Sequence, residues 1–209
     1  EGLLSLTTGE QQLSYLQIRY DDPTEGLESF LDEAADRVRE NPSQARRLAE
    51  ISADLATHLE IPGLIPRANY LRAQTHALAG EFEHALRLIE QARDAYFALG
   101  QRTAALRTTA GMLHVLGELG RYHEALDAAG GVLDEIGDRP PPDSPLAPVA
   151  ALMHQNMAVC YRLSGRFDEA LEANEAAGKL FRDLGMAAQA ADNSNNRGNL
   201  LWELGRGTE

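Results

Sequence analysis

The chain has 209 residues, of which 44% are apolar and 24% charged, and its formal net charge at pH 7 is −13. This composition indicates an ordered protein and excludes the disordered class, while the negative charge disfavours nucleic acid and anionic membrane surfaces as partners. Cys160 is the only cysteine, so an internal disulfide is excluded. No window approaches the roughly 18 apolar residues of a membrane span, and the N-terminus lacks a basic stretch before an apolar run. We therefore expect a cytoplasmic protein.

Residues 1–22 are expected to form an N-terminal segment, in which Leu13, Leu16 and Tyr20 share one helix face. A short helix is predicted there. Two helix-start signals follow, Asp22-Pro23-Thr24-Glu25 and Asn41-Pro42-Ser43-Gln44. Each places a capping side chain before a proline at the first helical position, and adds a longer side chain that reaches back to the cap. These signals predict helices over residues 23–39 and 42–59.

A seven-residue pattern then recurs along the chain, with a glycine first, an aromatic residue third and Ala-Leu at its end. Its copies are Gly80–Leu86, Gly120–Leu126 and Gly165–Leu171, and a fourth copy begins at Gly205-Arg206. Such a fixed period is the signature of a repeat architecture. Further glycines fall between the copies, and glycine often ends helices because it adopts a left-handed backbone without steric cost. Each repeat is therefore predicted to hold two antiparallel helices.

The remaining helices are predicted from these glycine stops. In each copy the alanine should let two helix backbones approach closely, and the aromatic residue should fill the wedge between them. Pro140-Pro141-Pro142 interrupts the series with a long loop, after which Ser144 can cap the next helix. The expected helices cover residues 66–79, 82–98, 102–119, 122–136, 145–163, 167–184 and 187–204.

The pattern, preceded by a small residue seven positions upstream, resembles the tetratricopeptide repeat (TPR). Ala73, Ala158 and Gly198 are these small residues, whereas Leu113 replaces one of them in the second copy, and the repeats are longer than the family's usual unit. The resemblance covers residues 23–209, about 4.5 repeats, and implies an all-α, right-handed α-solenoid of antiparallel helix pairs. We expect a fragment that is truncated at its C-terminus, because the chain opens at Glu1 and the fourth copy stops short.

Repeats that end in Leu-Gly, as at Leu99-Gly100 and Leu184-Gly185, are similar to those of large bacterial regulators. One group couples TPR repeats to a caspase-like protease domain (the TPR-CHAT proteins), and another joins them to the modules of transcription regulators. The resemblance implies a scaffold that binds a protein or peptide and regulates an effector domain outside this chain. No catalytic residue carries over. The alternative is a sensor that binds a small molecule or a signalling peptide in its groove.

In such a stack the first helix of each pair lines a concave groove. Its inward face follows the spacing i, i+4, i+7, and amide side chains there can both donate to and accept from an extended peptide. Some alternatives stay open: Asn196 and Asn199 can bond the neighbouring helix, Trp202 can pack on a missing partner helix, and Arg162 can form an internal ion pair. The predicted peptide contacts are Tyr70, Gln74, His114, Gln155, Arg162, Asn195, Asn199 and Trp202.

The sequence offers no pattern for catalysis, metal binding or cofactor binding. No two of the six histidines have the i, i+4 spacing of a one-helix metal site, and every recurring glycine is a single helix stop. His154 and Cys160 lie about 240° apart round a helix, so Cys160 is expected to be a buried small residue. We predict a non-enzymatic chain without metal or cofactor. Its last helix is expected to expose Leu200, Leu201 and Leu204 and to drive end-to-end self-association.

Overall fold

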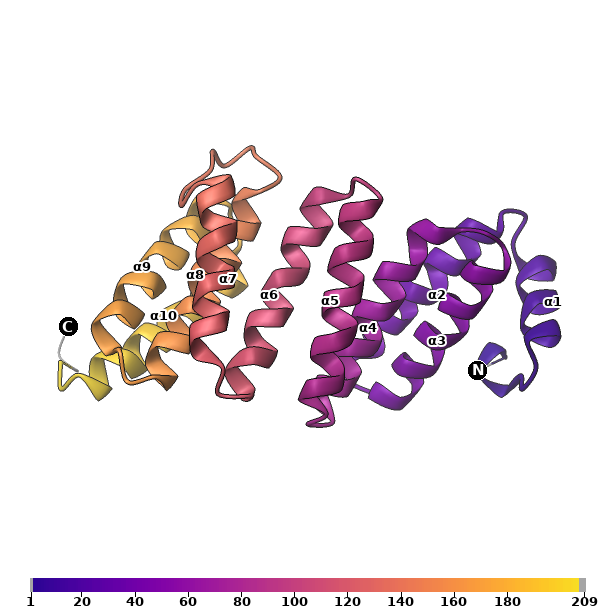
Figure 1. The fold of residues 1–209 in the computed structure, drawn as a ribbon, viewed down its shortest axis with the longest axis horizontal. Coiled ribbons are helices and arrows are strands. Elements are labelled where there is room, and N and C mark those ends of the chain that lie inside the picture. Colours follow the sequence, from indigo (N-terminus) through magenta and orange to yellow (C-terminus); the bar gives the residue numbers. More distant parts are fainter. Residues whose placement is uncertain (1, 207–209) are drawn as a thin grey trace. The chain divides into compact units, whose positions relative to one another are not determined.

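The computed structural model describes residues 2–206, in which every regular element is helical (Figure 1). The predicted all-α class is confirmed. The end of the fourth repeat copy, residues 207–209, lies outside the described residues. None of the helices in residues 2–206 is long and apolar enough to cross a membrane. The elements are η1 (Leu3–Ser5), α1 (Gly9–Arg19), α2 (Pro23–Arg37), α3 (Pro42–His58), η2 (Pro62–Leu64), α4 (Ile65–Leu78), α5 (Phe82–Ala98), α6 (Arg102–Glu118), α7 (Tyr122–Ile136), α8 (Ala147–Leu163), α9 (Phe167–Asp183) and α10 (Ala187–Glu203).

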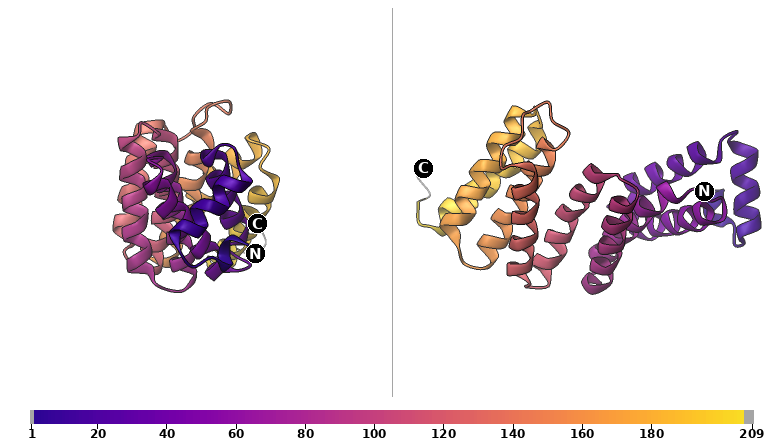
Figure 2. Two further views of the ribbon diagram at one scale, coloured as in Figure 1. Left: turned by 90° about the vertical axis from the view of Figure 1, so that its right-hand side faces the viewer. Right: turned by 45° about the horizontal axis from the view of Figure 1, so that its top comes forward.

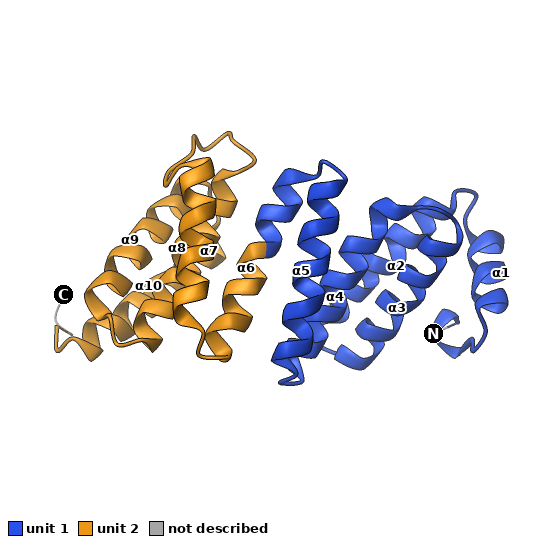
Figure 3. Cartoon of the chain, in the orientation of Figure 1, with its two compact units in different colours: residues 1–108 blue, residues 109–209 orange. Residues whose placement is uncertain are grey.

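The chain divides into two compact units within α6, between Thr108 and Thr109 (Figure 3). From α2 to α5 and from α7 to α10, consecutive helices run antiparallel and lie side by side, which the views of Figure 2 also show. Helices α2, α3, α4 and α5 pack on one another in this order in the first unit, and α7, α8, α9 and α10 do so in the second. Each unit is thus a stack of antiparallel helix pairs, as an α-solenoid requires.

The recurring glycines end helices as the sequence predicts. Gly80 has a φ of 76°. Its amide donates to the Ala77 carbonyl at 3.0 Å and the Glu81 amide donates to the His76 carbonyl at 2.9 Å, so the last carbonyls of α4 are satisfied. The same two bonds recur after α5, α6, α8, α9 and α10. Because the next helix starts directly after this turn, the two helices must run antiparallel.

Side-chain caps start α2 and α3, also as predicted. Asp22 accepts a hydrogen bond from the Thr24 amide at 2.8 Å, and Asn41 accepts one from the Gln44 amide at 3.2 Å. The expected return of the Gln44 side chain to its cap is wrong, because its Oε1 atom accepts from Arg37 instead, at 2.5 Å. This bond ties the start of α3 to the end of α2.

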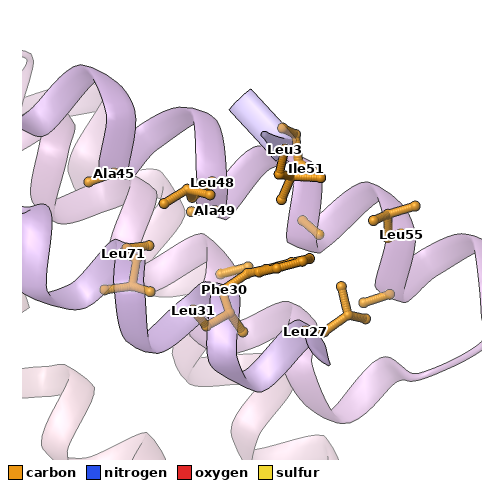
Figure 4. Packing of buried hydrophobic residues seen from close by; sticks show 14 of the residues in the cluster. Leu3, Leu27, Phe30, Leu31, Ala45, Leu48, Ala49, Ile51, Leu55 and Leu71 are labelled. Atoms are coloured by element: carbon orange, nitrogen blue, oxygen red, sulfur yellow. The ribbon is translucent and has the colours of Figure 1, made fainter. Parts of the chain in front are cut away.

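The core of the first unit forms between α2 and α3 (Figure 4). Leu27, Phe30 and Leu31 of α2 meet Leu48 and Ile51 of α3, and each of these side chains is at most 3% exposed. Burying one such side chain contributes about 1.5–3 kcal/mol. The hydrophobic face at the spacing i, i+3, i+4 therefore holds this pair together.

The predicted short helix in the N-terminal segment is α1, and it closes the same core. Leu16 is fully buried, and the Tyr20 ring meets the Phe30 ring edge-on, with the ring centroids 5.7 Å apart. The approach of α1 to α2 is close at Gly26. A Cβ atom there would overlap Leu16 and lie 2.7 Å from Cδ2 of Tyr20. Glycine is thus needed at this position for steric reasons.

Small residues also bring the helices of the second unit together. The repeat alanines Ala125 and Ala170 are fully buried, as expected. The expectation that the last helix exposes its leucines is wrong, since Leu200 and Leu201 are 2% and 3% exposed and Leu204 is half-buried. The reason is that α10 packs its apolar face against α9.

We predict that Gly26→Ala lowers the free energy of unfolding of the first unit by about 1–3 kcal/mol, because the added methyl group overpacks the contact of α1 with α2. Thermal unfolding followed by circular dichroism measures this. Gly9→Ala is the matched control, because a Cβ there meets nothing within 4 Å. An equal loss of stability in both variants would contradict the steric explanation.

Candidate functional site

A groove with a volume of about 260 Å³ lies between α8 and α10 in the second unit. Both helices are the first members of their pairs, which is the position where the repeat pattern predicts a ligand groove. We call it the α8–α10 groove. Its lining residues are Gln155, Ala158, Val159, Arg162, Asn174, Asn196, Asn199, Leu200, Trp202 and Glu203.

Three amide side chains in this groove have unused hydrogen-bonding capacity. Gln155 is half-buried, and Asn196 and Asn199 are exposed. None of the three side-chain amides hydrogen-bonds to another residue among those described. Each amide group offers one carbonyl acceptor and two N–H donors. The groove can therefore pair with both the N–H and the C=O groups of an extended peptide backbone.

Charged and aromatic side chains complete the groove wall. Arg162 pairs with Glu203 across the groove at 3.6 Å, so the internal ion pair is the alternative that the structure favours. Both side chains are more than a third exposed, and such a pair stabilises the fold by at most about 1 kcal/mol. Trp202 is 79% exposed. Its ring offers a large flat apolar surface at the edge of the polar groove.

A buried amide bridge holds α10 on α9 beneath the groove. Asn174 of α9 donates to the side-chain oxygen of Asn193 at 3.0 Å, and Asn193 of α10 donates back to the Asn174 carbonyl at 2.9 Å. The two residues are 1% and 4% exposed. Gly178, one turn beyond Asn174, makes room for this bridge, because a Cβ there would lie 2.7 Å from Nδ2 of Asn193.

The structure brings together four of the eight predicted contacts: Gln155, Arg162, Asn199 and Trp202 line the α8–α10 groove. The other four do not join them. Tyr70 and Gln74 lie on α4 in the first unit, and His114 is exposed on α6. Asn195 is exposed on α10 but does not line the groove.

The position of Asn195 has a geometric cause. The repeat spacing gives every first helix the same inward phase, which predicts Asn195 opposite Gln155. The two walls of a groove, however, present opposite flanks of their helices. Asn196, one residue further and about 100° round the helix, therefore faces α8 in place of Asn195. Glu203 and Asn174 also line the groove, although neither is among the contacts predicted from the sequence.

Tyr70 and Gln74 form a smaller polar site in the first unit. Burial raises the pKa of the Tyr70 phenol, while the Arg107 charge and a hydrogen bond with Gln74 lower it. The Gln74 amide is thus engaged with Tyr70, unlike the amides of the α8–α10 groove. This pair is better explained as local structure than as a ligand contact.

The turn between α4 and α5 carries a second titratable cluster. His76 contacts Glu81, and this hydrogen bond chiefly lowers the pKa of the Glu81 carboxyl. The His84 ring lies 4.2 Å from the His76 ring between centroids, and burial chiefly lowers the pKa of His84, helped by the charges of His76 and Arg87. Across residues 2–206 no group of three His, Cys, Asp or Glu side chains could hold a metal ion. The cluster ties the turn together.

Cys160 lies behind the groove and is 1% exposed, which confirms the expected buried position. Burial raises the pKa of its thiol to about 11. A thiol with so little thiolate at neutral pH is a poor nucleophile. Its position on α8, beside Gly117 of α6, fits a packing role.

We predict that Asn193→Leu destabilises the second unit by about 1–3 kcal/mol, because it leaves the buried side-chain oxygen of Asn174 without its donor. The double variant Asn174→Leu/Asn193→Leu should recover most of this loss, since no polar group is then stranded. Urea unfolding followed by far-ultraviolet circular dichroism measures both. Asn195→Leu, on the exposed face of the same helix, is the control and should change stability by less than about 0.5 kcal/mol. A double variant no better than Asn193→Leu would contradict the bridge.

We also predict that a disulfide reagent at pH 8 labels Cys160 in the native chain about 100-fold more slowly than in the urea-unfolded chain, since burial both raises its pKa and blocks access. Absorbance of the released thiol measures the two rates. Equal rates would mean that Cys160 is accessible in the native state.

Comparison with solved structures supports the assignment of the fold. No family model matches the chain, and no curated protein matches its sequence. Among solved structures the chain is similar to MamA, from residue 41 to its end, from Desulfovibrio magneticus RS-1, a TPR-containing protein. The TM-score is 0.50 at 15% sequence identity, and the match covers 86% of this chain and 95% of that one. At this identity the likeness supports the fold alone, which is a TPR-like helical repeat fold.

Proposed function

We propose that the chain is a protein-binding scaffold whose α8–α10 groove holds an extended peptide segment of a partner. The proposal rests on the side-chain amides of Gln155, Asn196 and Asn199. They line one groove, and they form no hydrogen bonds with other residues that the structure describes. Unpaired amides at a groove surface suit a peptide backbone whatever its side chains. The exposed Trp202 ring beside them supplies the apolar contact that anchors many interfaces.

The finer parts of the proposal rest on the sequence resemblance. We propose a bacterial, cytoplasmic protein in which residues 23–209 form the TPR-like repeat domain and 1–22 an N-terminal segment. In this proposal the scaffold regulates an effector domain outside the chain, as in TPR-CHAT proteins or TPR-containing transcription regulators. No catalytic role is assigned to the described residues.

The alternative function, a sensor for a small molecule or signalling peptide, has less support. Small-molecule pockets usually measure about 300–1,000 Å³ and enclose their ligand in aromatic and apolar side chains. The α8–α10 groove measures about 260 Å³ and has one aromatic residue, Trp202, which is mostly exposed. Its shape and polarity fit a peptide better.

Self-association through the end of α10 also has less support than the sequence suggested. Its stated basis was an exposed leucine face, but Leu200 and Leu201 are buried. Trp202 is the large apolar side chain that α10 exposes. One exposed tryptophan is a small patch compared with the several hundred Å² that mark an association surface.

The proposal predicts that Asn196→Ala/Asn199→Ala/Trp202→Ala strongly weakens partner binding, because it removes two backbone-pairing amides and the apolar anchor. The measurement is quantitative affinity capture from a lysate of the source organism, followed by a titration with the purified captured protein. The expected rise in Kd is about 100-fold, a loss of about 2.7 kcal/mol.

The matched control is Asn195→Ala, which removes an exposed amide from the same helix outside the groove. It should leave Kd within about two-fold of the original value. A partner that binds the triple variant and the original chain equally well would reject the groove as its docking site.

A further inference from the structure

A second groove lies on the other flank of α8, between α8 and α9, and it differs in chemistry from the first. Its volume is about 570 Å³. Met157 and Tyr161 of α8 and Ala173, Ala176 and Leu180 of α9 form its apolar floor. The loop after α7 closes one end of it with Asp138 and Arg139. We call it the α8–α9 groove.

The floor of the α8–α9 groove cannot pair with an extended backbone. An extended peptide laid on apolar side chains would leave its N–H and C=O groups without partners, which costs about 1–3 kcal/mol for each buried group. An α-helix satisfies these groups internally. The small side chains of Ala173 and Ala176 also leave room for a helix to approach closely. The floor therefore selects a helical ligand.

The length of the groove fits a short helix. Its lining extends along α9 from Glu169 to Leu180. Eleven helical steps of about 1.5 Å span roughly 16 Å, which equals three helical turns. A ligand helix of this length that packs one side on the floor would carry apolar residues at the spacing i, i+3, i+4 and i+7.

The charge at the rim favours a basic ligand. Glu169 hydrogen-bonds to Arg166 at 2.9 Å, Glu175 pairs with Arg197 at 3.5 Å, and these carboxylates are therefore compensated. Glu172 lies between them, is exposed, and has no ion-pair or hydrogen-bond partner among the described residues.

The other end of the groove is closer to neutral. Arg139 is paired with Asp183 at 2.5 Å, and the remaining charges there are those of Asp138 and Lys179. Glu172 is thus the carboxylate best placed to receive a cation from a ligand. The net charge of −13 also attracts a basic partner to the chain, and repels an acidic one, before the two come into contact.

We propose that the α8–α9 groove docks a short amphipathic helix of a partner protein, with its apolar face on Met157, Tyr161 and Ala176 and an arginine or lysine on Glu172. This is helix-in-groove recognition. It is independent of the peptide proposed for the α8–α10 groove, since the two grooves share no lining residue.

The test selects peptides of about 14 residues from a random display library on the whole chain, and then measures the Kd of the enriched peptides. We expect enriched sequences with helical apolar spacing and net positive charge. Glu172→Arg should raise their Kd about ten-fold or more. Ala176→Arg, which fills the half-buried floor, should do the same. Circular dichroism verifies that both variants fold.

Two controls assign the binding to this groove. Asp127→Arg makes the same charge reversal at the equivalent repeat position of α7, where the side chain is exposed and outside the groove, and should leave Kd unchanged. Asn196→Ala/Asn199→Ala/Trp202→Ala should also leave it unchanged.

Lys179 is the only lysine of the chain and lies in the groove, so a bound arginine-containing peptide should slow its acylation by an amine-selective reagent.

Three results would overturn the proposal. One is a selection that enriches acidic peptides or none with helical apolar spacing. Another is binding that survives both Glu172→Arg and Ala176→Arg. The third is binding lost in the triple variant of the α8–α10 groove, which would place the peptides there and support the proposed function instead. Failure of the proposed function alone would leave peptide binding to the α8–α9 groove intact.

Discussion

The glycine turn that ends α4, α5, α6, α8, α9 and α10 is the constraint on which most of the structure depends. A positive φ at Gly80, and at its counterparts in the later repeats, lets two backbone hydrogen bonds close the helix end and reverse the chain within three residues. Because the connection is so short, the next helix must pack antiparallel on the previous one. Helix pairing, the buried repeat alanines and the grooves between neighbouring helices all follow from that reversal.

Most of the fold was predictable because it depends on this local and repeated chemistry. The helix bounds expected from glycine stops and proline-linked caps differ from the observed ones by at most two residues, at the end of α2 and the start of α8. The site was only partly predictable, because it depends on which flank of each helix meets its neighbour. Asn195 and Asn196 differ by one position in the sequence, yet only Asn196 lines the α8–α10 groove.

Two asparagines that depart from the repeat pattern are the sequence signal from which the buried amide bridge could have been predicted. Asn174 stands where the earlier copies have Ile89 and Ala129, which are 2% and 0% exposed. Asn193 stands where they have Ala68, Thr108 and Met153, each at most 2% exposed. An asparagine at a position that is buried in the other copies must find a hydrogen-bond partner. Here the two exceptional asparagines satisfy each other, and this bridge fixes α10 on α9.

The bridge between Asn174 and Asn193 also supports the walls of the two proposed binding grooves. Helix α8 contributes to both grooves from flanks about 120° apart, with Gln155 and Arg162 on one and Met157 and Tyr161 on the other. Helix α9 supplies the floor of the second groove and, through Asn174 and Asn193, the support for the outer wall of the first. Since the buried amides hold these walls in place before any ligand arrives, a ligand pays less to order them, and more of its contact energy appears as affinity. A polar groove for an extended chain and an apolar groove for a helix can thus coexist on three helices.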